Sequence, residues 1–226
     1  MTPPAPAIPA LVLCGGRGTR LESEAEKPLV AVCGEPMLDR VVRALRASQV
    51  SAVHAVTSTH APETRARATD LGLDVIDAPG EGYVADLRYA LDVVNPPVLT
   101  VVADLPHLGP DHVDRALVDA SRVAVPDDAE DAENTEDADA EDAGSSDTPT
   151  SLASLTVCVP VSLKRRLGAS VDTEFEHEDR AVAPTGLNVV GVGGDGTETV
   201  SVVGDERLAV NVNRPRDREV AESLCD

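Results

Sequence analysis

The sequence predicts an α/β fold with a mainly parallel central sheet, helices on both faces and a small added β section. Short apolar, β-prone runs alternate with amphipathic helical patterns through the first half of the chain. The first of these runs ends in a glycine-rich turn. The length of 226 residues suits one domain with its own core, so we expect a single domain over residues 1–226.

The elements of the first half follow in order from these patterns. An apolar stripe at helical spacing follows Pro36, and Val84 opens a similar stripe that we expect to be buried. The expected strands are residues 8–14, 53–57, 73–76 and 98–103, and the expected helices are residues 36–47, 62–70, 83–94 and 111–120. The loops after parallel strands meet at one edge of the sheet, which we expect to be the working edge.

An acidic segment separates this half from the rest of the chain. Residues 126–150 hold eleven acidic residues and no basic one. Such a segment cannot bury enough apolar surface to offset its ordering entropy, so we predict a disordered insertion, with a functional acidic docking tail as the alternative. Strand character returns at residues 154–161, 187–192, 199–203 and 208–212, and residues 215–224 predict a closing helix.

The net charge of −21, from 19 Lys and Arg against 40 Asp and Glu, argues against a protein that binds nucleic acid or an anionic membrane, since both need a basic face. The scarcity of lysine and the abundance of Asp favour a cytosol at molar salt, where the Debye length shortens to about 3 Å. A mesophilic protein with one acidic segment is the alternative.

The N-terminal stretch, the hydropathy and the cysteines lead us to expect a cytoplasmic protein. The N-terminal stretch has no basic region before its proline-broken apolar residues, and no run approaches a membrane span. The four cysteines, Cys14, Cys33, Cys158 and Cys225, have no C-x-x-C spacing. We therefore expect buried or incidental thiols, not a metal cluster or a disulfide framework.

The stretch over residues 13–29 carries the chemistry. Gly15, Gly16 and Gly18 let backbone N–H groups approach an anion, and the cations Arg20 and Lys27 return to the same loop. A triphosphate is the natural ligand of such a loop. The alternative interpretation is a tight βα connection without a ligand. The loop is neither a Walker A motif nor a dinucleotide fingerprint, because the required lysine–hydroxyl pair and third glycine are missing.

The L-C-G-G-R-G-T-R-L…K-P-L pattern resembles the signature of the MobA-like nucleotidyltransferases, which have a Rossmann-like fold. The segments G-E-G-Y-V-A-D-L, V-V-A-D-L-P-H-L, P-T-G-L-N-V-V and L-A-V-N-V-N-R-P-R-D resemble the archaeal corrinoid branch of that family. This resemblance implies transfer of GMP from GTP to adenosylcobinamide phosphate in cobalamin biosynthesis. The implied nucleotide-binding residues are Leu13, Cys14, Gly15, Gly16, Arg17, Gly18, Thr19, Arg20, Lys27, Gly80, Glu81, Gly82, Tyr83 and Asp104.

Asp104 ends a buried strand at the working edge, where a lone carboxylate is costly unless it holds a cation. The resemblance implies Mg²⁺ on Asp104 and Asn213, with Asn211 as the less certain ligand. A turn or capping role is the plainer alternative for all three residues. Arg20, Lys27 and Asp104 are the expected catalytic residues.

The resemblance also implies an acceptor site at Thr185, Gly186 and Asn188, although a satisfied strand-end Asn is nearly as good an interpretation of Asn188. A phosphomonoester is largely dianionic at pH 7, so the acceptor is its own nucleophile and no general base is required. We therefore expect a surface or structural role for His107. Another phosphorylated acceptor, such as molybdopterin, phospholactate or a sugar phosphate, and a silent GTP-binding module are the competing hypotheses.

Overall fold

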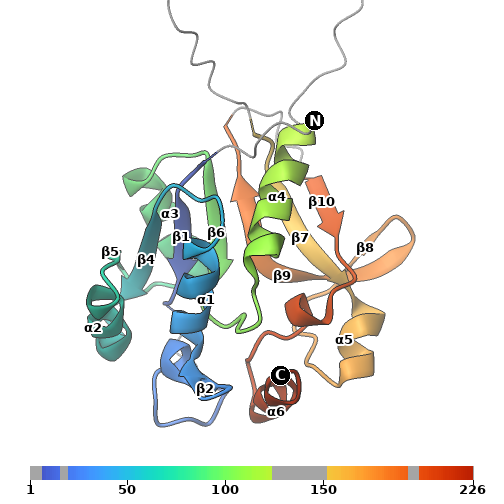
Figure 1. The fold of residues 1–226 in the computed structure, drawn as a ribbon, viewed down its shortest axis with the longest axis horizontal. Helices are drawn as coiled ribbons and strands as arrows, with labels where there is room; N and C mark the ends of the chain where they lie inside the picture. Colours follow the sequence, from blue (N-terminus) through green and yellow to red (C-terminus); the bar gives the residue numbers. More distant parts are fainter. Residues whose placement is uncertain (1–6, 16–19, 124–151, 193–198, 226) are drawn as a thin grey trace, which may run out of the picture.

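The computed structural model describes residues 7–15, 20–123, 152–192 and 199–225. An eight-stranded sheet runs through the centre of this part of the chain (Figure 1). Its strands are β1 (Ala10–Leu13), β4 (Val53–Ser58), β5 (Asp74–Ala78), β6 (Val98–Val102), β7 (Leu155–Pro160), β8 (Phe175–His177), β9 (Arg180–Val190) and β10 (Thr199–Val202). The predicted acidic insertion lies outside the described residues.

The strand order is β10-β7-β9-β6-β1-β4-β5, and β8 pairs with β9. Strands β6, β1, β4 and β5 are parallel neighbours, as are β7 and β10. The long strand β9 runs antiparallel to β6, β7 and β8. The sheet is therefore mainly parallel with an antiparallel section, as the sequence predicts.

Helices cover both faces of the sheet (Figure 1). The helices are α1 (Met37–Arg46), α2 (Pro62–Asp70), α3 (Tyr83–Val93), α4 (Pro110–Val123), α5 (Val161–Leu167) and α6 (Pro215–Ser223), with the 3-10 turns η1 (Lys27–Leu29) and η2 (Glu206–Leu208). Apolar side chains of α1 and α4 pack with β1, β6, β7 and β9 in the larger core. Helix α3 packs on the other face. None of the described helices is long and apolar enough to span a bilayer.

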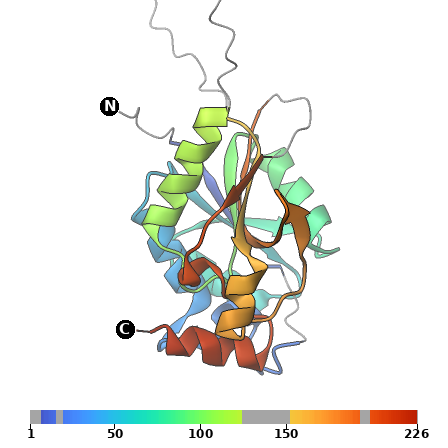
Figure 2. The ribbon, with the colours of Figure 1, turned by 90° about the vertical axis from the view of Figure 1, so that its right-hand side faces the viewer.

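Helix α6 packs against residues 21–37 in a core of its own (Figure 2). Val212 and Ala221 meet Leu21, Val32 and Met37 there, and all five are buried. Val32 belongs to a small antiparallel hairpin of β2 (Ala31–Val32) and β3 (Glu35–Pro36). This packing brings the segment before α6 next to the loops that follow β1 and β6.

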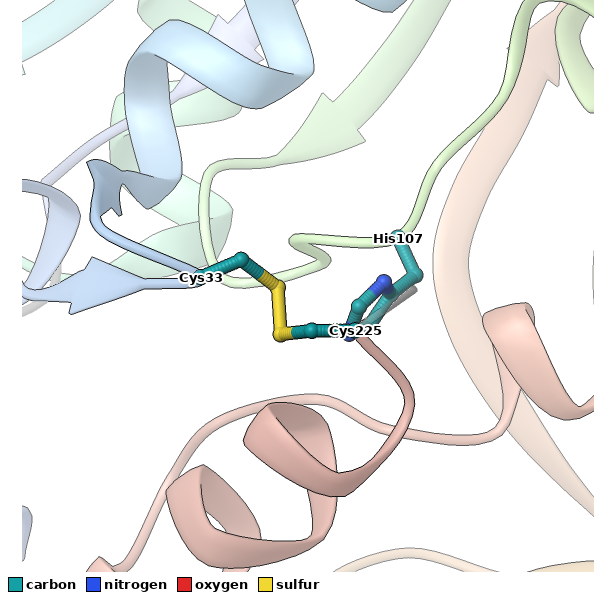
Figure 3. A group of neighbouring side chains, drawn as sticks. All are labelled: Cys33, His107 and Cys225. Atoms are coloured by element: carbon teal, nitrogen blue, oxygen red, sulfur yellow. A yellow bond between two sulfur atoms is a disulfide. The ribbon is translucent and has the colours of Figure 1, made fainter.

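A disulfide joins Cys33 in the hairpin turn to Cys225 after α6, 192 positions further along the sequence (Figure 3). The expectation of free thiols is therefore wrong for these two cysteines, whose pairing depends on α6 folding back onto the hairpin. It is confirmed for Cys14 and Cys158, which are buried and not disulfide-bonded. Burial raises the pKa of the Cys14 thiol to about 12, so this thiol stays protonated and unreactive.

His107 lies beside the disulfide (Figure 3). Its side chain is buried, with 8% of the residue exposed. Its Nε2 atom is 2.8 Å from the carbonyl oxygen of Ala221 in α6. The ring thus anchors α6, which agrees with the expected structural role. Cys33, His107 and Cys225 also bring three potential metal-ligand atoms close together, but both sulfur atoms are bonded to each other.

The structure corrects three details of the predicted elements. The expected strand over residues 208–212 is instead the end of η2 followed by irregular chain, because the apolar run is buried without a strand partner among the described strands. Strand β9 begins at Arg180, well before the predicted start, despite Pro184 and Gly186 within it. Val84 is 59% exposed, although its spacing predicts a buried position.

Candidate active site

Three side chains that lie far apart in the sequence meet at the carboxyl end of β6. The Lys27 ammonium donates hydrogen bonds to Oδ2 of Asp104 and, at 2.6 Å, to Oδ1 of Asn213. The side chains of Lys27 and Asp104 are each only 15% exposed. The ammonium of Lys27, predicted to bind the phosphates, is thus bonded to both predicted metal ligands, Asp104 and Asn213.

Local structure explains this convergence. Asp104 follows β6, so the parallel sheet carries it to the edge where β1 also ends. The backbone N–H of Val212 donates to the carbonyl oxygen of Asp104 at 2.9 Å, which holds the C-terminal segment alongside. Asn211 Nδ2 donates to Oδ1 of Asp104 at 3.1 Å and to the carbonyl oxygen of Thr185 at 2.8 Å. Both carboxylate oxygens of Asp104 are therefore fixed in orientation.

A cavity of about 440 Å³ opens beside this cluster; we call it the first cavity. Its lining residues come from the ends of β1, β4 and β6, from η1 and from the turn before α3: Leu13, Cys14, Gly15, Lys27, Pro28, Val56, Gly80, Glu81, Gly82, Tyr83, Asp86, Val102, Ala103 and Asp104. Every predicted nucleotide-binding residue within the described chain, apart from Arg20, lines this cavity. Gly16, Arg17, Gly18 and Thr19 lie outside the described residues.

Asp86 holds the turn before α3 in place. Its carboxylate is buried and accepts a hydrogen bond of 2.8 Å from the backbone N–H of Gly80. A Cβ atom on Gly15 would lie 2.8 Å from Oδ2 of Asp86, so glycine there permits the close approach. Asp86 is not among the site residues predicted from the sequence. Its position could have indicated this role, since Asp86 is an acidic residue in the first turn of a helix that follows Gly80 and Gly82.

Tyr83 separates the first cavity from a second one, and it lines both. The side chain is 49% exposed at the surface of the protein. Desolvation, with a smaller contribution from the Asp104 carboxylate, raises the pKa of the Tyr83 phenol, so the hydroxyl stays protonated at neutral pH. It is thus available as a hydrogen-bond donor.

The second cavity has a volume of about 660 Å³ and shares Tyr83, Val102 and Asp104 with the first. Thr185, Gly186 and Asn188 line it. The Thr185 hydroxyl is already engaged, since it donates to the carbonyl oxygen of Val157 at 2.8 Å. Asn188 Nδ2 donates to Thr100 Oγ1 at 3.4 Å, so this amide has a structural partner as well.

Gly186 is required by the geometry of β9. Its φ is +83°, and a Cβ atom there would lie 2.4 Å from Cγ2 of Val102. Any larger residue would displace Val102, which lines both cavities. The residues predicted for the acceptor thus lie together, with Gly186 shaping the wall between the cavities.

Arg20 is placed apart from Lys27 and Asp104. Its side chain is 70% exposed, and Nη1 lies 3.8 Å from Oδ1 of Asp172, to which Arg214 also donates. Arg20 lines neither cavity, although Asp172 lines the second. The structure therefore does not bring Arg20 into the cluster around Asp104; its guanidinium lies near the Asp172 carboxylate instead.

Lys164 in α5 lines the second cavity and was not singled out from the sequence. It is 4% exposed, and its ammonium donates to Oδ1 of Asn211 at 3.2 Å. Burial lowers its pKa, although Asp217, Asp104 and Asp172 act in the opposite direction. Lys164 lies in a run of three basic residues, which is usually a solvated helix face.

The donor set around Asp104 fits Mg²⁺. The oxygens of Asp104 and Asn213 already converge on one cationic atom, Nζ of Lys27. Mg²⁺ is commonly held by one or two carboxylates together with substrate phosphates, which a single aspartate with an amide oxygen can support. Asn211 instead presents its NH₂ group to Asp104.

Comparison with solved structures shows the same fold. A crystal structure of Rv0371c from Mycobacterium tuberculosis H37Rv has a TM-score of 0.59 at 15% identity, with 97% of this chain and 100% of that chain covered. A CMP:2-keto-3-deoxy-manno-octonic acid synthetase complexed with CTP has a TM-score of 0.54 at 15% identity, with coverage of 88% and 90%. These similarities confirm the predicted Rossmann-like α/β fold.

Curated relatives match part of the chain. An adenosylcobinamide-phosphate guanylyltransferase of Methanocaldococcus jannaschii is 36% identical over 104 residues, which are 44% of this chain and 53% of that protein. A bifunctional protein GlmU of Alkalilimnicola ehrlichii is 31% identical over 117 residues, which are 50% of this chain and 25% of that protein. The chain thus spans about half the length of the first relative and a quarter of the second.

A family model described as MobA-like NTP transferase domain matches residues 10–184. The match contains Lys27, the turn before α3 and Asp104, whereas Thr185 and Asn213 lie beyond it. It extends over most of the sequence, from β1 into β9. The chain therefore belongs to the MobA-like NTP transferase domain family.

Proposed function

We propose that this protein is a guanylyltransferase that transfers GMP from GTP to adenosylcobinamide phosphate. A phosphate oxygen of the acceptor attacks the α-phosphorus of GTP, and the bond from that phosphorus to the bridging oxygen of the β-phosphate breaks. The products are adenosylcobinamide-GDP and pyrophosphate. The observation that carries this proposal is the Lys27–Asp104–Asn213 cluster at the wall between two cavities.

In this proposal the nucleotide occupies the first cavity. The backbone of Gly80 and Gly82, together with Tyr83, faces the base and ribose, and Gly15 lets the chain approach the phosphates closely. The Lys27 ammonium neutralises charge that builds on the phosphate oxygens during transfer. Arg17 and Arg20 are assigned to the outer phosphates, and Arg20 must leave its partner Asp172 to reach them.

The acceptor occupies the second cavity, where Gly186 and Asn188 contribute to the wall. Its phosphate carries its own nucleophilic oxygen, so the chain needs no general base. Asp104 and Asn213 would hold Mg²⁺, which neutralises the triphosphate and the leaving pyrophosphate when bound. With these oxygens holding Mg²⁺, the Lys27 ammonium would be available to the nucleotide phosphates.

The choice of acceptor is supported by the similarity to the Methanocaldococcus jannaschii relative, whose description names adenosylcobinamide phosphate. Other phosphorylated acceptors would use the same first cavity, so the second cavity must discriminate between them. A silent GTP-binding module is disfavoured, since a module without turnover has no need for both Lys27 and Asp104 in one cluster.

The test is release of pyrophosphate by the purified chain with Mg²⁺, GTP and adenosylcobinamide phosphate, in molar KCl because we propose a halophilic cytoplasmic protein. We expect pyrophosphate and nucleotidylated corrinoid in equal amounts. Sugar phosphates, phospholactate and molybdopterin serve as alternative acceptors, and thermal stabilisation by GTP, ATP, CTP and UTP measures base selectivity. Turnover with another acceptor only would overturn the corrinoid assignment, and GTP binding without any turnover would favour the silent module.

A further inference from the structure

Lys164 is a buried ammonium in the wall of the second cavity. It belongs to the sequence Lys164-Arg165-Arg166 in α5, where both arginines face outward and form ion pairs with Glu174 and Glu206. Lys164 alone turns inward, and it is 4% exposed. The fold thus selects one of three adjacent basic residues for the cavity.

The charge on this group is compensated only from a distance, by the carboxylates of Asp217, Asp104 and Asp172. Among the described residues no carboxylate lies within ion-pair distance of Nζ, and the hydrogen bond of 3.2 Å to Asn211 Oδ1 occupies one of its three donors. A buried ammonium is costly unless an anion or several acceptors satisfy it. The exposed arginines beside it have carboxylate partners, although they need them less. Lys164 therefore has donors to spare for an anion in the cavity.

Lys164 is also connected to the reacting centre. Its partner Asn211 donates through Nδ2 to Oδ1 of Asp104, whose other oxygen accepts from Lys27. The two ammonium groups thus belong to one hydrogen-bond network, which reaches Oδ2 of Asp104 from Lys27 and Oδ1 of Asp104 from Lys164 through Asn211. Lys27 lines the first cavity and Lys164 the second.

We infer that the Lys164 ammonium binds the phosphate of the acceptor in the second cavity. The inference rests on the proposed function to the extent that the acceptor is a phosphomonoester. The ammonium compensates the dianion, and its hydrogen bond to Asn211 keeps the phosphate next to Asp104. Lys164 then determines the KM for the acceptor, while Lys27 binds the phosphates of the nucleotide.

Kinetics of Lys164→Met provide the first test, since methionine fills a similar volume without charge. Loss of charge-assisted hydrogen bonds to a phosphate should raise the acceptor KM about 10- to 100-fold, while the KM for GTP stays within about twofold. Lys164→Arg should recover part of the acceptor affinity. The matched control is Arg165→Met, which removes the same charge from the same helix at the surface and should leave both KM values unchanged.

A direct measurement keeps the test independent of turnover. Lys27 and Lys164 are the only lysines in the sequence, so protein grown with ¹³Cε-labelled lysine gives two side-chain NMR signals, assigned with Lys164→Arg. Titration with inorganic phosphate, without nucleotide, should move the Lys164 signal. Titration with GTP should move the Lys27 signal first.

The outcomes separate the two proposals. If the wild-type protein transfers nothing to adenosylcobinamide phosphate but phosphate still moves the Lys164 signal, the corrinoid assignment fails and the anion site stands. If turnover occurs but the Lys164 signal is static and Lys164→Met leaves the acceptor KM unchanged, the anion site is wrong. Should Lys164→Met fold poorly, as judged by its melting temperature, the wild-type titration and Lys164→Arg decide.

Discussion

Replacement of Asp217 by alanine tests how the C-terminal helix supports the active site. Asp217 is fully buried in the first turn of α6. Its carboxylate accepts hydrogen bonds from the backbone N–H groups of Ser170, Asn213 and Arg214, at 2.7, 3.1 and 2.9 Å, and from the Ser170 hydroxyl at 2.7 Å. It therefore joins the turn after α5 to the segment that carries Asn213.

The structure gives the size of the expected effect. Asp217→Ala leaves three backbone N–H groups without their acceptor, and each unsatisfied buried donor costs about 1–3 kcal/mol. Ser170, Asn213 and Arg214 are only half-buried, so water recovers part of this loss. We expect the free energy of unfolding to fall by about 3–5 kcal/mol, a large share of the stability of an ordinary domain.

Urea unfolding followed by far-UV circular dichroism measures this difference through the midpoint at constant slope. The matched control is Glu219→Ala, which removes the same charge from an exposed position of α6 and should change stability by less than about 0.5 kcal/mol. Turnover of folded Asp217→Ala should also fall, because Asn213 loses its backbone anchor. Equal stability of the two variants would refute the assigned role of Asp217.

Three further predictions concern charge and covalent linkage. Asp104→Ala and Lys27→Ala should each lower the pyrophosphate release rate at least about 100-fold without unfolding, and near-wild-type rates in either variant would contradict its catalytic role. Reduction of the Cys33–Cys225 disulfide, which closes a loop across 192 positions, should lower the free energy of unfolding by an amount on the order of 5 kcal/mol. A reductant should lower the melting temperature of the wild type and leave Cys225→Ser unaffected. Hydrogen bonds from Arg207 hold the pKa of Asp205 well below its usual value. The ionised Asp205 carboxylate therefore stabilises the fold above about pH 3.9, and this stabilisation is lost as the pH falls. In unfolding experiments at several pH values, Asp205→Asn should reduce the loss of stability on the acid side, and an unchanged pH profile would contradict the role assigned to Asp205.

The part of the site that could be predicted follows from sheet topology. Lys27 and Asp104 follow features that the sequence marks clearly, a glycine-rich turn and a buried strand. Parallel strands bring the ends of β1 and β6 to one edge, and η1, which follows the glycine-rich turn, carries Lys27 to that edge. Asn213 was predicted only by resemblance, and its contact with Lys27 depends on how α6 packs against the hairpin.

The parts that could not be predicted depend on tertiary contacts between distant residues. Nothing in the Lys164-Arg165-Arg166 run indicates which side chain is buried, because a helix of seven residues has too few turns to define a face. Arg20 follows the glycine-rich turn in sequence, yet Asp172 pairs with it.

Apolar composition indicates burial more reliably than it indicates strand structure. Leu208 and Val212 are fully buried as the sequence suggests, yet the chain between them is irregular. Its direction is set by contacts such as the one from Val212 to Asp104, and not by pairing with a neighbouring strand among the described ones. Short apolar runs are therefore ambiguous without knowledge of their neighbours.

The placement of both lysines in one hydrogen-bond network has a practical consequence. Amine-directed reagents, such as reductive methylation mixtures, activated-ester dyes and lysine cross-linkers, find side-chain amines in this protein only beside Asp104. Procedures that are harmless for lysine-rich enzymes would modify the active site of this one. Apart from the terminal α-amine, a general amine label is therefore selective for these two lysines, and its rate of attachment to each reports how accessible the corresponding cavity is.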